Sequence, residues 1–178
     1  MANLGSNPGP GTKIENEMLD ASVMELVDIT DLKSVGCNGR GGSSPPARTK
    51  TIEVLTDLAI KNIGAGSTGR TKFKLAAAVV YKNNIIATGV NSYKTHPLMS
   101  NNWYKEGQYF LHAEVDAIKN ALKLISVEQL TKCELYVVRV KRPGSNSKEW
   151  IHGLAKPCKG CEKLIANFGI NKVFYTID

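Results

Sequence analysis

The spacing of hydrophobic and polar positions changes several times between residue 50 and the end of the chain. Apolar residues recur at intervals of three and four in three segments, the spacing typical of amphipathic helices. These predicted helices cover residues 51–63, 111–125 and 158–168. Short apolar runs, partly β-branched, predict strands between them. The predicted strands cover residues 73–81, 85–91, 134–140 and 172–177.

The order of these elements predicts how they are arranged in space. Lys82, Asn83 and Asn84 form a short polar link between the first two strands, which is typical of a β-hairpin. The last two strands flank a helix, so we expect them to be parallel with a right-handed crossover. A hairpin and a parallel pair in one sheet make that sheet mixed. The sequence therefore predicts an α/β fold, a three-layer α/β/α sandwich around a mixed sheet.

Residues 1–49 differ in composition from the rest of the chain. They are rich in Gly, Ser, Asn and Pro, and only Val23 to Leu32 shows any apolar pattern. We expect a mostly disordered extension here, followed by a single folded domain over residues 50–178, which is room for one ordinary core.

The extension invites a second hypothesis. Two of its sections end alike, with a Gly-Ser-Pro-containing stretch leading to Thr-Lys at Thr12 and again at Thr49. Codons can be chosen for residues 30–35 and 41–46 that form the self-complementary stems of a transfer-RNA anticodon arm and T-arm. On this hypothesis, residues 1–49 are translated from transfer-RNA genes that lie upstream of the true reading frame. The alternative is that they form an ordinary linker or tail. Clustered transfer-RNA genes would suit a phage genome.

Charge is distributed unevenly. The chain has a formal net charge of +7, yet residues 1–49 hold four Lys/Arg against six Asp/Glu, and residues 50–178 hold 19 against 10. A domain with a net charge of +9 attracts phosphates, which favours a nucleotide or nucleic-acid ligand without choosing between them. No apolar run approaches the roughly 20 residues that span a bilayer, and the start shows no secretory pattern. We expect a cytoplasmic protein with no membrane contact.

Two short motifs stand at predicted helix starts. His112-Ala113-Glu114 opens the second helix, and Pro157-Cys158-Lys159-Gly160-Cys161 opens the third. Two of the four cysteines thus lie in a Cys-x-x-Cys motif. Without an export signal, this spacing favours metal or redox chemistry over disulfides.

His-x-Glu followed by Pro-Cys-x-x-Cys resembles the signature of the zinc-dependent nucleobase deaminases. Over roughly residues 51–178 the chain is similar to the cytidine and deoxycytidylate deaminase superfamily. The resemblance implies that His112, Cys158 and Cys161 bind Zn²⁺, a set of three protein ligands that leaves a fourth position for water. It also implies that Glu114 moves protons from that water to the ring nitrogen and the leaving amine.

The resemblance implies two substrate-binding residues as well. Asn91 occupies the place of an asparagine that hydrogen-bonds the sugar in the family, and its alternative role is a turn residue at the strand end. Ala113 is the small residue whose backbone N–H faces the base. Cys133, His96 and His152 are the remaining candidates for a fourth ligand of a structural zinc site. Without further cysteines we expect no second zinc.

Two loops and the end of the chain depart from the family. The basic insert at residues 141–156 either contacts phosphate or nucleic acid, with Trp150 available for stacking, or is a flexible solvated loop with Trp150 packed on the domain. The segment 92–108 carries aromatic residues that either stack on a base or pack over the helix. These are Tyr93, Trp103 and Tyr104. Relatives continue beyond the strand that ends near Asp178, which predicts an exposed sheet edge that a homo-oligomer could cover.

Three functions remain open. The leading one is deamination of a cytosine nucleotide or nucleoside, dCMP to dUMP above all, because Phe174-Tyr175 and the Gly169–Val173 run resemble that branch. The second is a polynucleotide deaminase acting on single-stranded DNA or transfer RNA, which the basic domain favours. Adenine is disfavoured because Lys159-Gly160 stands where the adenosine branch usually carries a Met. The third is a non-catalytic zinc module, which an intact Glu114 argues against.

Overall fold

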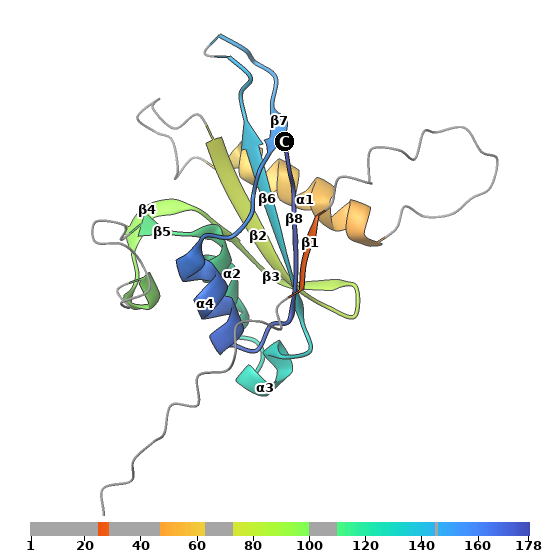
Figure 1. Ribbon diagram of the computed structural model, residues 1–178, viewed down its shortest axis with the longest axis vertical. Helices are drawn as coiled ribbons and strands as arrows, with labels where there is room; N and C mark the ends of the chain where they lie inside the picture. Colours follow the sequence, from red (N-terminus) through yellow and green to blue (C-terminus); the bar gives the residue numbers. More distant parts are fainter. Residues whose placement is uncertain (1–24, 29–46, 63–72, 100–109, 145) are drawn as a thin grey trace, which may run out of the picture.

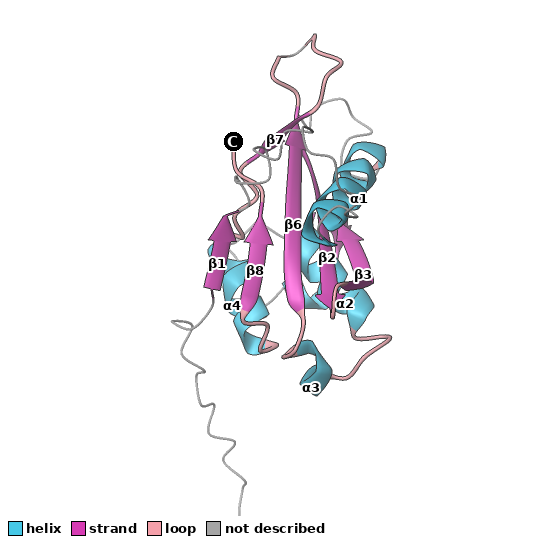
Figure 2. Cartoon of the chain, turned by 90° about the vertical axis from the view of Figure 1, so that its right-hand side faces the viewer, coloured by secondary structure: helices cyan, strands magenta, loops and turns pink. Residues whose placement is uncertain are grey.

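The computed structural model describes residues 25–28, 47–62, 73–99, 110–144 and 146–178. A central sheet separates helix α1 (Ala47–Lys61) on one face from α2 (Ala113–Ala121) and α4 (Lys159–Asn167) on the other (Figures 1 and 2). The three-layer α/β/α sandwich predicted from the sequence is confirmed. No helix in these ranges is long and apolar enough to cross a bilayer.

The central sheet is mixed, as predicted. Its strands are β1 (Glu25–Asp28), β2 (Phe73–Tyr81), β3 (Asn84–Val90), β6 (Glu134–Lys141), β7 (Ile151–Gly153) and β8 (Lys172–Tyr175). Their order is β1-β8-β6-β2-β3, and β7 pairs with the far end of β6. The β2–β3 and β2–β6 pairs are antiparallel, whereas β6–β8 is parallel, which confirms the prediction for the last two strands.

Smaller elements complete the described chain. A separate two-stranded ribbon joins β4 (Ser92–Thr95) to β5 (Phe110–Leu111). The 3-10 helix η3 (Pro97–Met99) and the short helix α3 (Val127–Leu130) lie in connections. None of these is predicted by the sequence patterns. They are too short for helical or strand periodicity to be recognised.

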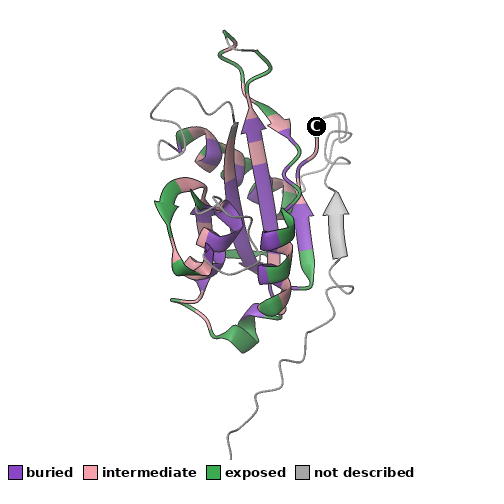
Figure 3. Cartoon of the chain, turned by 60° about the vertical axis from the view of Figure 1, so that its left-hand side comes forward, coloured by how far each residue is buried: buried purple, intermediate pink, exposed green. Residues whose placement is uncertain are grey.

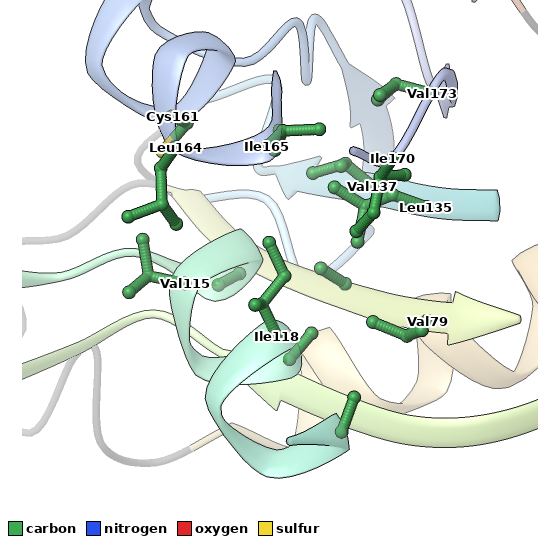
Figure 4. Packing of buried hydrophobic residues seen from close by; sticks show 14 of the residues in the cluster. Val79, Val115, Ile118, Leu135, Val137, Cys161, Leu164, Ile165, Ile170 and Val173 are labelled. Atoms are coloured by element: carbon green, nitrogen blue, oxygen red, sulfur yellow. The ribbon is translucent and has the colours of Figure 1, made fainter. Parts of the chain in front are cut away.

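Strand β2 shows how one sequence run serves both faces of the sheet. Ala77 and Val79 belong to the core under α2 and α4, whereas Ala76, Ala78 and Val80 belong to the core under α1. This alternation is the two-residue period of a strand covered on both sides. The core under α2 and α4 also contains Leu135 and Val137 from β6, Val173 from β8, and Ile118, Leu164 and Ile165 from the helices (Figure 4).

The β2–β3 hairpin turns in two residues. Tyr81 pairs directly with Asn84, so the turn consists of Lys82 and Asn83, one residue fewer than predicted. Both residues have positive φ, 47° and 64°, as a type I′ turn requires. Asparagine accepts this conformation readily, whereas lysine does so at some cost.

The structure moves the boundaries of two predicted helices. Helix α2 begins at Ala113 instead of residue 111, because Leu111 pairs with Ser92 in the β4–β5 ribbon. Helix α1 begins at Ala47, so the folded domain starts before residue 50. The first turn of α1 is anchored by Arg48, whose guanidinium lies 4.4 Å from the centre of the Phe174 ring.

The sheet edge at β8 is not exposed, which corrects the prediction from the sequence. Strand β1, from the apolar stretch of the N-terminal extension, pairs in parallel with β8, Leu26 opposite Val173. An open strand edge presents unpaired N–H and C=O groups, and β1 satisfies them. The β8 edge therefore gives no reason to expect a homo-oligomer, and oligomerisation itself stays a prediction. The predicted disorder of residues 1–24 and 29–46 lies outside the described residues.

The basic insert forms a hairpin where a flexible loop was predicted. Strand β7 pairs with the end of β6, Lys141 opposite Ile151, so the hairpin projects from one end of the sheet (Figures 1 and 3). Its described tip is largely exposed, in contrast to the buried strands below it (Figure 3). Trp103 and Tyr104 of the other predicted loop lie outside the described residues.

Candidate active site

The candidate metal ligands lie at the starts of two helices. His112 is the N-cap residue of α2 and Cys158 is the N-cap residue of α4, both with extended backbone. Within the described chain, neither side chain caps its own helix. Cys161 follows in the first turn of α4 and is fully buried. The two helix starts thus present all three side chains to one point between them.

The three donor groups have the spacing that one metal ion needs. His112 Nδ1 lies 3.2 Å from Cys161 Sγ and 3.7 Å from Cys158 Sγ, and all three donor atoms lie within 4.8 Å of one another. Tetrahedral zinc with ordinary Zn–N and Zn–S bonds separates its donors by about 3.6–3.8 Å. The residues present therefore fit zinc. Among the described residues this is the only His/Cys/Asp/Glu group of three or more that could hold a metal.

The electrostatics of the cluster favour a thiolate at Cys158. A hydrogen bond with Cys161, assisted by His112, lowers the pKa of Cys158 to about 4. The hydrogen bond with Cys158 raises the pKa of His112. A cysteine at a helix N-terminus beside an imidazole readily becomes a thiolate, which is the form that binds metals. No disulfide joins the three cysteines in the described ranges, Cys133, Cys158 and Cys161.

Glu114 lies beside the metal cluster in the first turn of α2. Its side chain is 3% exposed, and burial raises its pKa, an effect that His112 opposes. The carboxyl group contacts Cys161, but Oε2 has no hydrogen-bond partner among the residues that the structure describes. A buried carboxylate oxygen without a partner is costly, so this atom is suited to a molecule bound beside the metal.

Asn91 lies next to the cluster through the β4–β5 ribbon. Ser92 is paired with Leu111, so Asn91 and His112 flank the same cross-strand pair. The Asn91 Oδ1 atom accepts a hydrogen bond from the Leu75 N–H (2.9 Å). The structure thus brings Asn91 to the end of the sheet where α2 begins.

Ala113 is buried in the first turn of α2, between His112 and Glu114. Its backbone carbonyl faces Gly89 of β3, where a Cβ atom would lie only 2.6 Å away. The sequence singles out Ala113 for its place in the His-x-Glu motif. The structure adds that its peptide is packed directly on the sheet.

Sequence analysis missed the residues that fix the start of α2 on β3. Asp116 Oδ2 accepts a hydrogen bond from the Val90 N–H (3.1 Å), and its carboxylate is also ion-paired with Lys119. The close approach of Gly89 has the same effect. An acidic residue in the first turn of a helix is too common to signal such a contact. A glycine inside an apolar strand is a usable signal of close backbone approach.

The other candidate ligands lie apart from this cluster. Buried Cys133 donates from Sγ to the Gln129 carbonyl (3.3 Å) after α3. His96 Nδ1 accepts from the Leu98 N–H (3.2 Å) at the 3-10 helix. His152 Nε2 lies 3.0 Å from Thr56 Oγ1 of α1. Helix α1 covers the face of the sheet opposite to α2 and α4, so His152 does not reach the cluster.

Trp150 is packed on the domain. It lies partly buried against the core beneath α1. Lys74 Nζ lies 5.2 Å and the Arg142 guanidinium 4.8 Å from the centre of its ring. A ring engaged by two cations and by the core is poorly placed to stack on a base. Of the two interpretations of Trp150, packing is the one that the structure supports.

The fold and the cluster together are typical of a zinc-binding α/β protein, with three side chains that could hold the metal and an acidic residue beside them. Residues 49–177 match the family described as "Cytidine and deoxycytidylate deaminase zinc-binding region", and the chain belongs to this family. The zinc expected from the sequence is thereby confirmed.

Two similar solved structures come from one phage. The chain is 23% identical to the dCMP deaminase of cyanophage S-TIM5 in complex with dCMP and dUMP, with a TM-score of 0.48, over 77% of this chain and 86% of that one. It is 24% identical to the apo form of the same enzyme, with a TM-score of 0.43, over 75% and 86%. The chain matches no curated protein.

Proposed function

We propose that this chain catalyses the hydrolytic deamination of a cytosine nucleotide or nucleoside, dCMP to dUMP above all, with release of ammonia. The observation that carries this proposal concerns Glu114, two residues after His112. Its Oε2 atom is buried and has no hydrogen-bond partner among the described residues. Membership of the cytidine and deoxycytidylate deaminase family supports the same reaction class. A purely structural zinc site has no need of such a carboxylate.

Each residue of the site has a distinct role in this proposal. His112, Cys158 and Cys161 hold the zinc ion. Zinc bound there lowers the pKa of a water molecule towards neutrality, so that a nucleophile is present at ordinary pH. Glu114 would take one proton from the water that attacks C4 of the base and pass it to N3, then take the second proton from the hydroxyl group now on C4 and pass it to the amino group, which leaves as ammonia. The sum is cytosine plus water giving uracil plus ammonia.

Asn91 and Ala113 orient the substrate in this proposal. Asn91 Oδ1 accepts the hydrogen bond from the Leu75 N–H, so the NH₂ group is the part of the Asn91 amide that can contact a ligand. A sugar hydroxyl oxygen is a suitable acceptor for it. Ala113 has no bulk beyond Cβ, so its N–H at the start of α2 can face the base. Both contacts hold the base still relative to Glu114, which is how orientation lowers a reaction barrier.

A polynucleotide substrate is the second candidate. The observation that favours it is the exposed basic hairpin, where Arg142 and Lys148 lie on the surface and Lys156 follows near the zinc helix. Packing of Trp150 on the domain weakens this candidate, because the hairpin then lacks its one aromatic stacking platform. We therefore place the mononucleotide first.

Ammonia release from a substrate panel tests the proposal. The panel contains dCMP, CMP, cytidine, adenosine and single-stranded DNA, with the zinc-loaded full chain as enzyme. We expect the highest kcat/KM with dCMP and no release of ammonia from adenosine. Preference for single-stranded DNA would favour the second candidate. Inactivity on every cytosine compound, with one zinc bound per chain, would restore the non-catalytic zinc module.

A further inference from the structure

We propose that Asn62 is a positioning residue that acts through Asn91 and fixes which side of the Asn91 amide faces the substrate. Asn62 follows helix α1 directly and is 8% exposed. Its Nδ2 atom donates to the Asn91 backbone oxygen (2.9 Å) and to Asn91 Oδ1 (3.3 Å). This inference rests on the proposed function, in which Asn91 contacts the sugar of the nucleotide.

The orientation of the Asn91 amide follows from its fixed neighbours. The Leu75 backbone N–H can only donate, so the Asn91 atom that meets it at 2.9 Å must be the acceptor Oδ1. The Asn91 N–H in turn donates to the Leu75 carbonyl (3.3 Å). Asn62 supplies a second donor to the same oxygen. Both donors hold Oδ1 inward, and the NH₂ group of Asn91 is left to point away from them.

Asn62 is itself held in place from two sides. Its own N–H donates to the Ala59 carbonyl (3.1 Å), which closes the last turn of α1. Lys74 Nζ donates to the Ile60 carbonyl (2.7 Å), which ties the same end of α1 to β2. The end of α1 is therefore fixed relative to β2. Asn62 lies at this end, so its hydrogen bonds hold Asn91 in a fixed position as well.

The chemical consequence is selectivity for a ligand that offers an acceptor oxygen. dCMP carries one sugar hydroxyl, at the 3′ position, and its oxygen can accept from the outward NH₂ group. A 2′,3′-dideoxy nucleotide has no hydroxyl there and gains nothing from an ordered Asn91. The effect of Asn62 should therefore depend on the 3′-hydroxyl, although Asn62 does not touch the substrate.

The kinetic test compares Asn62→Ala with Asn120→Ala. Asn120 is a matched control, because its Nδ2 also donates to a backbone carbonyl, that of Thr88 in β3 (2.9 Å), and this hydrogen bond does not involve Asn91. For Asn62→Ala we expect KM for dCMP to rise about five- to tenfold with kcat within about twofold, the pattern of lost uniform binding. KM for 2′,3′-dideoxy-CMP should stay within about twofold.

A double-mutant cycle separates positioning from general loosening. In an Asn91→Ala background, Asn62→Ala should change KM for dCMP less than twofold, because the residue through which it acts is gone. An equal rise in KM in both backgrounds, or an equal rise with and without the 3′-hydroxyl, overturns the inference. Asn62→Ser replaces Asn62→Ala if the latter does not fold.

Hydrogen exchange at the Leu75 amide decides the inference without turnover. In Asn62→Ala we expect this amide to exchange at least about tenfold faster than in the wild type, because Asn91 Oδ1 is less well held. Asn120→Ala should leave it unchanged. An unchanged rate in Asn62→Ala overturns the inference even where the wild type turns over dCMP. An inactive wild type with the expected exchange pattern rejects the proposed function alone.

Discussion

A Cβ atom added to Gly89 would lie 2.1 Å from the backbone nitrogen of Ala117, so strand β3 and helix α2 are in backbone contact at this point. The contact lies one helical turn from His112 and Glu114, and the hydrogen bond from the Val90 N–H to Asp116 adjoins it. The end of β3 therefore sets the position of the helix start that carries His112, the proposed metal ligand, and Glu114, the proposed proton carrier.

Gly89→Ala should be strongly destabilising. The new methyl group meets backbone atoms of α2, which cannot move aside as a flexible side chain can. We expect a loss of about 3 kcal/mol or more in the free energy of unfolding, measured by denaturant titration, and a lower zinc content. Gly144→Ala is the matched control, since a Cβ there meets nothing within 4 Å. Equal stability of the two variants would contradict the close approach.

Zinc should bind with a stoichiometry of one per chain and stabilise the fold. Cys161→Ala removes a proposed ligand that is fully buried, so we expect metal analysis to show loss of zinc and thermal unfolding to occur at a lower Tm. Cys133→Ala is the control, because this buried cysteine bonds to the Gln129 carbonyl instead. It should keep its zinc. A full equivalent of zinc retained in Cys161→Ala would remove Cys161 from the ligand set.

Residues 1–46 should be dispensable for the site. We propose that residues 1–49 are an extension, on the hypothesis that they are translated from transfer-RNA genes, and the part of it before α1 is the part that can be removed without cutting a helix. Of the elements in the described ranges, a chain that begins at Ala47 loses the four-residue edge strand β1 alone. We expect it to keep its zinc and activity, with Tm lowered by less than about 5 °C. Deletion through Lys61 is the contrasting variant, because it removes buried Leu55 and Ala59 and should prevent folding.

The gene itself supplies a second check on that hypothesis. Codons that break the stems assigned to residues 30–35 and 41–46 would rule it out. Loss of zinc from the chain that begins at Ala47 would show instead that β1 is integral to the domain.

Single-stranded DNA should bind weakly through the basic hairpin. Surface phosphate contacts are sensitive to salt, so we expect affinity to fall steeply between low and physiological salt. Arg142→Ala with Lys148→Ala should weaken this binding while kcat/KM for dCMP stays within about twofold. Measurement of binding by fluorescence anisotropy, beside dCMP turnover, checks both. A large loss of dCMP turnover in this variant would place the hairpin in the substrate site.

The elements with long periodic patterns are the ones that the sequence predicts. The alternation in β2 and the three- and four-residue spacing in α2 reflect burial on defined faces, so the sandwich and the presence of its helices follow from them, whereas the starts of α1 and α2 do not. The four-residue strand β1 depends on a partner distant along the chain, β8, and the three-residue strand β7 depends on pairing with the end of β6. No local pattern encodes such a partner.

The same distinction holds within the site. His112, Cys158 and Cys161 are visible as candidate ligands because metal ligation demands particular residue types at fixed spacings, and Glu114 is visible because it completes the His-x-Glu motif. Asn62 is not visible, since a single asparagine after a helix is common and its role depends on a contact with a residue 29 positions away.

Glu114→Gln tests the central claim most directly. Glutamine keeps the shape of the side chain but cannot accept and return a proton, so we predict that kcat for ammonia release from dCMP falls by about 10³-fold or more. Zinc content and Tm, measured on the same preparation, should match the wild type. Wild-type rates in Glu114→Gln, with one zinc bound, would contradict the account.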